Sequence, residues 1–212
     1  HVITKLSHIH FPSTEKSKER IVMLGENKND VFNVGCPAID YIKKIKITER
    51  KDLKKLRGLE KLITEDYVLF LQHPVTTEIN SYYQMMETLE SLQSFGKDVI
   101  LIYPNPDPGS KKMLKAIRDM SKKYKNKCVI KNKFKNLEFE SFINLLYHSF
   151  CLVGNSSCGI REAYALRKYV IDIGTRQKNR ERSENVFNVN HNRQEILSAL
   201  QHIRGNIGTF PE

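Results

Sequence analysis

The sequence predicts an α/β fold: a Rossmann-like open parallel sheet with helices on both faces. The first observation is a set of short apolar runs, among them 67–71 (YVLFL), 99–103 (VILIY) and 150–153 (FCLV). Strands that are apolar throughout are buried on both faces, as in parallel sheets. The second observation is that segments with apolar residues at helical spacing separate these runs, which indicates βαβ units. The third is that polar, loop-forming residues follow the runs, where parallel sheets bind their ligands.

From about residue 64 onward, the predicted strands and helices alternate. We predict strands at 67–71, 99–103, 128–130, 150–153, 169–173 and 186–189. Helices are predicted after each strand up to 150–153 and after the last one, because apolar residues recur there at the spacing of one helix face. Asn192 and Glu195 stand at capping-box spacing before the last helix, although the box itself prefers Ser or Thr.

Residues 1–63 are less regular. We expect the end of a helix, a strand near 9–13, a helix from about Glu15 to Met23, a strand at 31–37 and a basic helix at 51–62. Such a stretch suits a crossing between domains, so we assign 1–30 to the end of a preceding domain and 31–212 to the next one. The chain starts at His1 with no signal-peptide features, and we expect it to begin inside a longer protein.

Composition and charge limit the possible classes of protein. The chain is 40% hydrophobic and 28% charged, and no apolar run approaches the ~18 residues of a membrane span. Its four cysteines lack metal-binding spacing, which favours a reducing, cytoplasmic setting and argues against structural zinc. The net charge of +11 suits nucleic-acid binding, but the lysines alternate with apolar positions, as on a solvated helix face. We therefore expect neither a membrane nor a nucleic-acid partner.

The segment 154–162 (GNSSCGIRE) is the strongest candidate for a ligand-binding loop. Small residues between a strand and a helix let main-chain N–H groups approach a phosphate, and a helix N-terminus favours negative charge. The hydroxyls of Ser156 and Ser157 can donate to the same oxygens, and Glu162, deeper in the helix, can accept bonds from ribose hydroxyls. On spacing alone, a simple N-cap is an equally good interpretation.

Two further polar side chains follow predicted strands. His73 comes directly after 67–71, where a histidine can act as a general acid or base. A histidine that only bonds a neighbouring loop is the more common case. Arg176 follows 169–173, and its planar guanidinium can neutralise a diphosphate. In a chain this basic, a surface arginine is the alternative.

Three motifs occur together: LQHPVTTE (71–78), GNSSCGIRE (154–162) and GTRQ (174–177). In this order and spacing they resemble the hydrolysing UDP-N-acetylglucosamine 2-epimerases of sialic-acid pathways, and the resemblance runs from residue 1 to about 189. It implies the C-terminal half of a GT-B-type enzyme with two Rossmann-type domains and an active site between them. The implied reaction converts UDP-N-acetylglucosamine and water to N-acetylmannosamine and UDP, by elimination of UDP and then addition of water. No metal or redox cofactor is implied.

The resemblance also implies roles for residues of this chain. His73 matches a cleft histidine that acts in acid/base chemistry or on the leaving phosphate. Ser156 and Ser157 are expected to hold the diphosphate, Glu162 the ribose, and Phe139 to lie near the uracil. The full expected UDP-binding set is Asn105, Phe139, Ser156, Ser157, Gly159, Glu162 and Arg176.

Some features depart from the family pattern. Residues 167–169 (RKY) stand where relatives usually have Gly-x-Pro, and 178–185 (KNRERSEN) lack the expected glycines. The acidic residues that move the C2 proton and the family's closing helix are expected outside these 212 residues. We therefore expect this half to bind nucleotide weakly, without turnover, and the full-length enzyme to form a homo-oligomer.

Three alternatives stay open. A different UDP-amino sugar, such as a diacetamido-trideoxy sugar, fits the same hydrolysing reaction. A GT-B glycosyltransferase shares the nucleotide domain, although HPVTT and SSCGIRE favour the epimerase. A non-enzymatic polyanion-binding module predicts nucleic-acid binding that falls steeply with salt and shows no preference for UDP.

Overall fold

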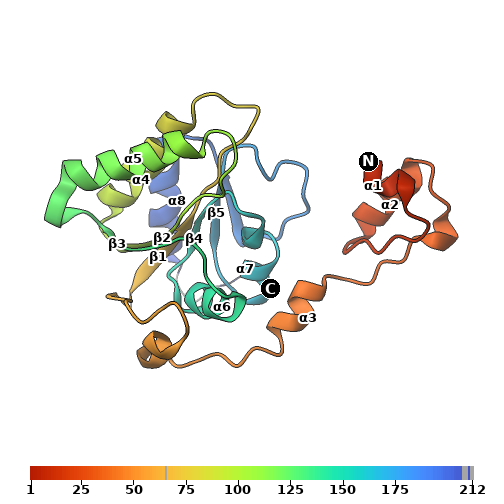
Figure 1. Cartoon of the computed structure of the whole chain (residues 1–212), viewed down its shortest axis with the longest axis horizontal. Helices are drawn as coiled ribbons and strands as arrows, with labels where there is room; N and C mark the ends of the chain where they lie inside the picture. The colour runs from red at the N-terminus through yellow and green to blue at the C-terminus, as the bar shows by residue number, and fades with distance from the viewer. Residues whose placement is uncertain (65, 207–209, 211–212) are drawn as a thin grey trace. The chain divides into compact units, whose positions relative to one another are not determined.

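The computed structural model describes residues 1–64, 66–206 and 210. The chain divides into two compact units, His1–Ile45 and Lys46–Glu212 (Figure 1). The sequence-based division into 1–30 and 31–212 concerns domains of a longer protein and stays a prediction.

The first unit contains short helices: α1 (Val2–Leu6), α2 (Glu15–Met23), the 3-10 turn η1 (Lys28–Asp30) and α3 (Pro37–Ile42). α2 confirms the predicted helix. It begins there because the Thr14 hydroxyl accepts a hydrogen bond from the main-chain N–H of Ser17 at 3.2 Å, which caps the first turn.

The two strands predicted in the first unit are wrong. The structure has instead a single parallel bridge between His10 and Val31. Val31 is buried, but Phe32 and Val34 are exposed, so this segment has no alternating buried face to hold a longer ladder. Pro12 has no N–H to donate to such a ladder.

In the second unit, the described residues form a six-stranded parallel sheet in the order β3-β2-β1-β4-β5-β6. The strands are β1 (Tyr67–Leu71), β2 (Asp98–Ile102), β3 (Ile130–Phe134), β4 (Leu152–Gly154), β5 (Val170–Ile173) and β6 (Val186–Val189). The chain builds outward from β1 to β3 and then returns to place β4 on the other side of β1. This reversal is the point at which doubly wound sheets bind ligands, and it confirms the predicted fold class.

Helices cover both faces of the sheet (Figure 1). One face carries α4 (Ser81–Phe95), α5 (Ser110–Tyr124) and α8 (Arg193–Gly205), and the other carries α6 (Phe139–His148) and α7 (Glu162–Ala165). Side chains of β1 contact helices on both faces of the sheet. Val68 and Phe70 belong to the core cluster that includes side chains of α4, α5 and α8. The hydroxyl of Tyr67 donates to the carbonyl of Leu145, in α6, at 2.9 Å.

Two predictions outside the candidate site need correction in this unit. The basic helix predicted at 51–62 is only the 3-10 helix η2 (Arg50–Lys55), and Gly58 follows with a φ of +85°, which a regular helix does not allow. β3 lies at Ile130–Phe134, later than the predicted 128–130. It is an edge strand whose Lys133 is exposed, so its apolar pattern covers only its start.

The last helix, α8, begins as predicted at the Asn192 cap. Asn192 Oδ1 accepts from the main-chain N–H groups of Gln194 and Glu195 at 2.9 and 3.1 Å. The capping box differs from the standard one. The Glu195 carboxylate accepts from the main-chain N–H of Asn190, whereas in a standard box it would accept from the N–H of the cap residue, Asn192. In the described part of the chain, no helix is long and apolar enough to cross a membrane.

Candidate functional site

The loops that follow β1 and β4 are joined at the reversal of strand order. The main-chain N–H of His73 donates to Asn155 Oδ1 at 2.7 Å, and Asn155 Nδ2 donates back to the carbonyl of His73 at 2.9 Å. Asn155 is 1% exposed and His73 5%. These reciprocal bonds fix the backbone of His73 in the crevice where the predicted site lies.

The ring of His73 is held by a third loop, the one after β2. The main-chain N–H of Asn105 donates to His73 Nδ1 at 3.1 Å. Burial lowers the pKa of His73 to about 4, and the positive charge of Arg176 acts in the same direction. Asp107 opposes them. His73 is therefore a neutral imidazole at physiological pH.

The loop after β5 joins the same cluster. Arg176 Nη1 and Gln177 Nε2 both donate to the carbonyl oxygen of Asn155, at 3.2 and 2.8 Å. Arg176 is half-buried, and Gln177 is buried. Asn155 thus connects the predicted His73 and Arg176, and three separate strand ends meet around it.

A buried ion pair supports the loop that carries Arg176. Asp172, near the end of β5, is 2% exposed, and its Oδ2 lies 3.1 Å from Arg182 Nη2. The guanidinium of Arg182 also donates to the carbonyl of Gln177. Burial raises the pKa of Asp172, although Arg182 and Arg176 oppose that rise. The ion pair holds the loop against the sheet.

The loop after β4 depends on two glycines. Gly154 has a φ of +142°, and a Cβ there would lie 1.9 Å from the carbonyl oxygen of Leu71. At Gly159 a Cβ would lie 2.8 Å from Val170 Cγ1, so this glycine packs directly on β5. Between them, Ser156 and Ser157 are partly exposed, which leaves their hydroxyls accessible to a ligand.

The helix predicted from about Ser157 is wrong. Residues Ser157–Gly159 form the 3-10 turn η4, and the separate four-residue α7 begins only at Glu162. Glycine is a poor helix former, and Gly159 is pressed against β5, so the turn does not continue as an α-helix. The expected contribution of a helix dipole to phosphate binding is therefore not supported by this geometry.

Glu162 is buried at the start of α7, not deeper in a helix. Its Oε1 lies 3.2 Å from Arg161 Nη2, and its side chain is 7% exposed. Within the described residues, its Oε2 has no hydrogen-bond partner. A buried carboxylate oxygen is costly when unpaired, so this atom lacks a partner that it requires.

Phe139 and Asn105 lie on the same edge of the sheet, farther from β4. Phe139 is the first residue of α6, which follows β3, and it is 37% exposed. The side chain of Asn105 is exposed, whereas its main-chain N–H bonds His73. The structure brings His73, Asn105 and Arg176 together around Asn155, with Ser156 next in the chain.

Sequence reasoning missed four residues that build the site: Asn155, Gln177, Asp172 and Arg182. The first two lie inside motifs that were already recognised. The signal for Asp172 was also available, because an acidic residue within a buried strand requires a cationic partner.

Another missed contact links the loops after β1 and β5. Thr175 Oγ1 donates to Glu78 Oε1 at 2.6 Å, next to Arg176. The ring of His191 packs beneath Gly174, where a Cβ would lie 2.4 Å from its Nε2. These contacts restrain both sides of the Arg176 loop.

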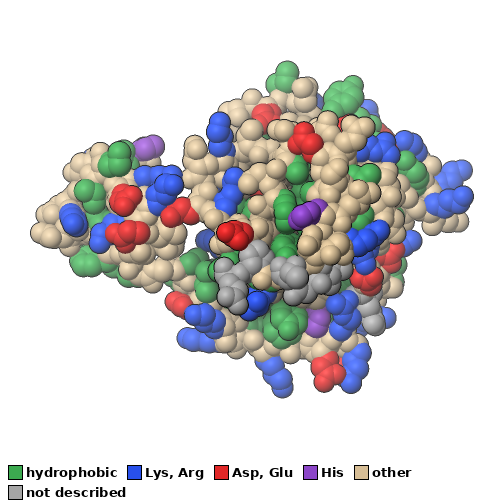
Figure 2. Space-filling model, turned by 180° about the vertical axis from the view of Figure 1, so that it is seen from behind, with side chains coloured by type: hydrophobic (Ala, Val, Ile, Leu, Met, Phe, Trp, Pro, Cys, Tyr) green, Lys and Arg blue, Asp and Glu red, His purple; other side chains and the backbone are tan. Residues whose placement is uncertain are grey.

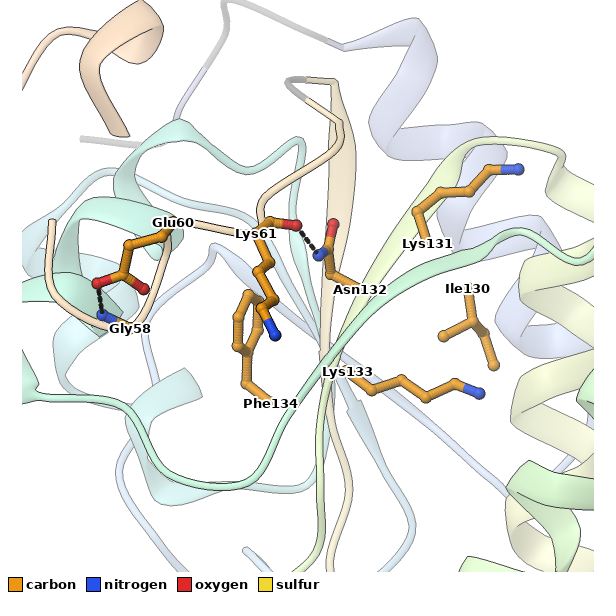
Figure 3. A pocket seen from close by; sticks show the side chains of 8 residues that line it. All are labelled: Gly58, Glu60, Lys61, Ile130, Lys131, Asn132, Lys133 and Phe134. Carbon is orange, nitrogen blue, oxygen red and sulfur yellow. Dashed lines mark hydrogen bonds between the residues drawn. The ribbon is translucent and has the colours of Figure 1, made fainter. Parts of the chain in front are cut away.

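Two cavities lie near the outer strands. One, of about 460 Å³, lies between β3 and residues 58–61, which the Asn132 amide ties to the strand by donating to the carbonyl of Lys61 at 2.8 Å (Figure 3). Its lining contains none of the predicted site residues. Another, of about 690 Å³, has a lining that includes Pro104 and Pro106, which flank Asn105, and basic side chains from α5 and β3.

One face of the protein carries side chains of both charges. On the face seen in Figure 2, basic and acidic side chains are interspersed, without one continuous basic stripe. This pattern does not favour a polyanion-binding module. Within the described residues, no group of three His, Cys, Asp or Glu side chains could hold a metal ion.

The fold and the strand-end loops define a Rossmann-like domain of the GT-B type. The family model described as UDP-N-acetylglucosamine 2-epimerase matches residues 1–209, and the chain therefore belongs to that family. A relative from Neisseria meningitidis serogroup B, named UDP-N-acetylglucosamine 2-epimerase, is 34% identical over 202 residues, covering 95% of this chain and 51% of the relative. A Legionella pneumophila relative named UDP-N,N'-diacetylbacillosamine 2-epimerase (hydrolyzing) is 33% identical, covering 95% and 52%.

Solved structures show the same fold. The UDP-GlcNAc 2-epimerase of Methanocaldococcus jannaschii, in complex with UDP-GlcNAc and UDP, aligns with a TM-score of 0.72 at 19% identity. The alignment covers 94% of this chain and 55% of that one. The chain thus spans about half the length of the relatives that it matches.

Proposed function

We propose that this chain forms the UDP-binding half of a hydrolysing UDP-N-acetylglucosamine 2-epimerase. The observation that carries the proposal is the joining of three strand ends, which bear His73, Arg176 and the Asn155–Ser157 segment, around one buried asparagine. Family membership and the likeness to UDP and UDP-GlcNAc complexes support it. The whole enzyme converts UDP-N-acetylglucosamine and water to N-acetylmannosamine and UDP in the cytoplasm, and we propose that it is a homo-oligomer.

In this proposal each loop contacts a different part of the nucleotide. Ser156, Ser157 and Gly159 receive the diphosphate, and Arg176 neutralises its charge. The unpaired Oε2 of Glu162 accepts from a ribose hydroxyl. Toward β3, Asn105 and Phe139 border the uracil. No metal or redox cofactor takes part, and nucleic acid is not a partner.

The reaction proceeds by elimination of UDP and then addition of water. The C1–O bond breaks with its electron pair on the β-phosphate oxygen, while C2 loses its proton to a base. His73 lies at the centre of the strand-end cluster and acts on the departing diphosphate.

A second sugar substrate is favoured by one observation. The relatives named for diacetylbacillosamine are 33% identical to this chain, against 34% for the relative named for UDP-N-acetylglucosamine. A UDP-diacetamido-trideoxy sugar is therefore the alternative substrate. Assays of the full-length protein with both UDP-sugars distinguish the two by which one releases UDP.

Calorimetric titration of UDP tests the nucleotide site on this chain. We expect UDP to bind more tightly than CDP or AMP, and Ser157→Ala and Arg176→Ala to weaken it. The loss for Arg176→Ala is expected at about tenfold or more, because a charge-assisted hydrogen bond contributes roughly 1.5–3 kcal/mol. Arg180→Ala is the matched control, since it removes an equal charge from an exposed position in the same loop.

Equal weakening by Arg180→Ala and Arg176→Ala would contradict the assigned site, because it would indicate a general charge effect. Binding of UDP that neither Ser157→Ala nor Arg176→Ala changes would place the nucleotide elsewhere.

A further inference from the structure

The hydrogen bond between Asn105 and His73 determines where the histidine carries its proton. The donor is a main-chain N–H, which cannot accept, so His73 Nδ1 must present its lone pair. A neutral imidazole has one N–H, and it therefore lies on Nε2. The tautomer is imposed by backbone geometry, independently of the Asn105 side chain.

We propose that the Asn105 main-chain amide is a positioning group that holds His73 as the neutral Nε2–H tautomer, so that His73 donates a hydrogen bond to the leaving diphosphate without transferring a proton. This inference rests on the proposed function. It gives the loop after β2 a second role, control of the histidine by a main-chain N–H, beside the proposed contact of the Asn105 side chain with the uracil. It also separates His73 from the acid/base chemistry at C2.

The surrounding contacts restrict rotation of the His73 ring. Asn155 binds both the N–H and the carbonyl of His73, and both residues are buried. Pro74 follows directly and restricts the backbone of His73. Turning the ring would leave the Asn105 N–H without its acceptor in a partly buried loop.

The surrounding charges also favour the neutral ring. Arg176, from the loop after β5, opposes a second positive charge, and burial acts in the same direction. Asp107, from the loop after β2, favours protonation but does not outweigh them. Protonation of Nδ1 would in addition place an N–H against the Asn105 N–H.

This state of the ring determines its chemistry. When the C1–O bond breaks, the electron pair stays on the β-phosphate oxygen, and the Nε2–H of His73 stabilises the growing negative charge. His73 keeps its proton, because donating it from a neutral ring would leave an imidazolate. The C2 proton passes to a general base in a step in which His73 takes no part. A neutral histidine used as an electrophile is established chemistry in another enzyme.

NMR of ¹⁵N-histidine-labelled protein, without nucleotide, tests the tautomer. We expect the His73 ring, assigned by the signals lost in His73→Gln, to show a protonated Nε2 and an unprotonated Nδ1 at pH 7. We expect it to stay neutral down to about pH 5. A protonated Nδ1, or titration near the ordinary histidine pKa of about 6.5, would overturn the proposal.

Two variants test the Asn105 amide. Asn105→Ala keeps the N–H and should preserve the wild-type ring signals, whereas Asn105→Pro removes it and should give mixed tautomers. If Asn105→Pro does not fold, the wild-type spectrum alone still decides the tautomer.

UDP added to the same sample separates this inference from the proposed function. If UDP binds and His73 becomes a cation, the inference fails and the UDP site stands. If the Nε2–H tautomer is present but saturating UDP changes no site signal, the inference about the ring holds and the proposed function fails.

Discussion

At the scale of single residues, Asn155 organises the site although it was not among the predicted site residues. Its side chain pairs with the backbone of His73, and its carbonyl accepts from Arg176 and Gln177. Every polar group of this amide has a partner, so the buried asparagine stabilises the fold and orients the loops.

The burial of His73 has a measurable consequence for stability. Its pKa is about 4 in the folded protein and about 6.5 when unfolded, so the folded state binds fewer protons between these values. Stability from this group is therefore present above pH 6.5 and is lost as the pH falls toward 4. We expect the wild type to lose about 3 kcal/mol over this window relative to His73→Gln.

Urea unfolding of both proteins between pH 7.5 and 4 measures this difference. His148 and His191 also have pKa values lowered by burial, but they are present in both proteins and cancel. Parallel pH profiles of the two proteins would show that His73 is not responsible.

At the scale of elements, the site depends on how β1 and β4 are held together at their C-terminal ends. Gly154 and Leu71 form the last residue pair between β4 and β1. Its φ of +142° and the contact with the Leu71 carbonyl leave no space for a side chain. The next residue, Asn155, still donates its main-chain N–H to the Leu71 carbonyl at 3.2 Å, so Gly154 keeps the two loops together.

We expect Gly154→Ala to reduce the free energy of unfolding by about 3 kcal/mol, because a residue with a side chain is strained in this conformation and meets the Leu71 carbonyl. Gly96→Ala is the matched control. Gly96 also has a positive φ, of +78°, but no atom lies within 4 Å of its added Cβ, so a loss of about 1 kcal/mol is expected. Denaturant unfolding measures both, and equal losses would contradict the steric argument.

At the scale of the whole molecule, the two compact units differ in how much apolar surface they bury. The second unit has a core of apolar side chains from the inner strands, α4, α5 and α8, and it also buries Leu145 and Leu146 of α6. The first unit buries few apolar side chains, among them Val31 and Ile42. Local stability follows buried contacts, so the two units should open at different free energies.

Native-state hydrogen exchange checks this difference. We expect the amides of β1 to exchange only through global unfolding. The amide of Phe32, which donates to the carbonyl of His10 at 2.8 Å, should exchange at a free energy several kcal/mol lower. Equal protection of Phe32 and Leu69 would show that the two units unfold as one.

The sequence by itself determined the parallel sheet, the main helices after β1, β2 and β3, and the strand-end positions of His73 and Arg176. Buried strands and amphipathic helices leave period-specific patterns of apolar residues, and these patterns are local. The Asn192 cap was equally local, because a cap bonds within three residues of itself.

Only the tertiary structure decided the rest. The Asn155 cluster joins loops from different strands, and its partners follow from the order of strands in space. The Asp172–Arg182 pair ties β5 to the loop that follows it, across ten residues of chain. The helix expected from Ser157 became a 3-10 turn because Gly159 packs on Val170 of β5, a contact that local propensity does not contain. The tautomer of His73 likewise depends on a main-chain N–H 32 residues away. Every residue except proline has such a group, so the residue type at that position does not predict the contact.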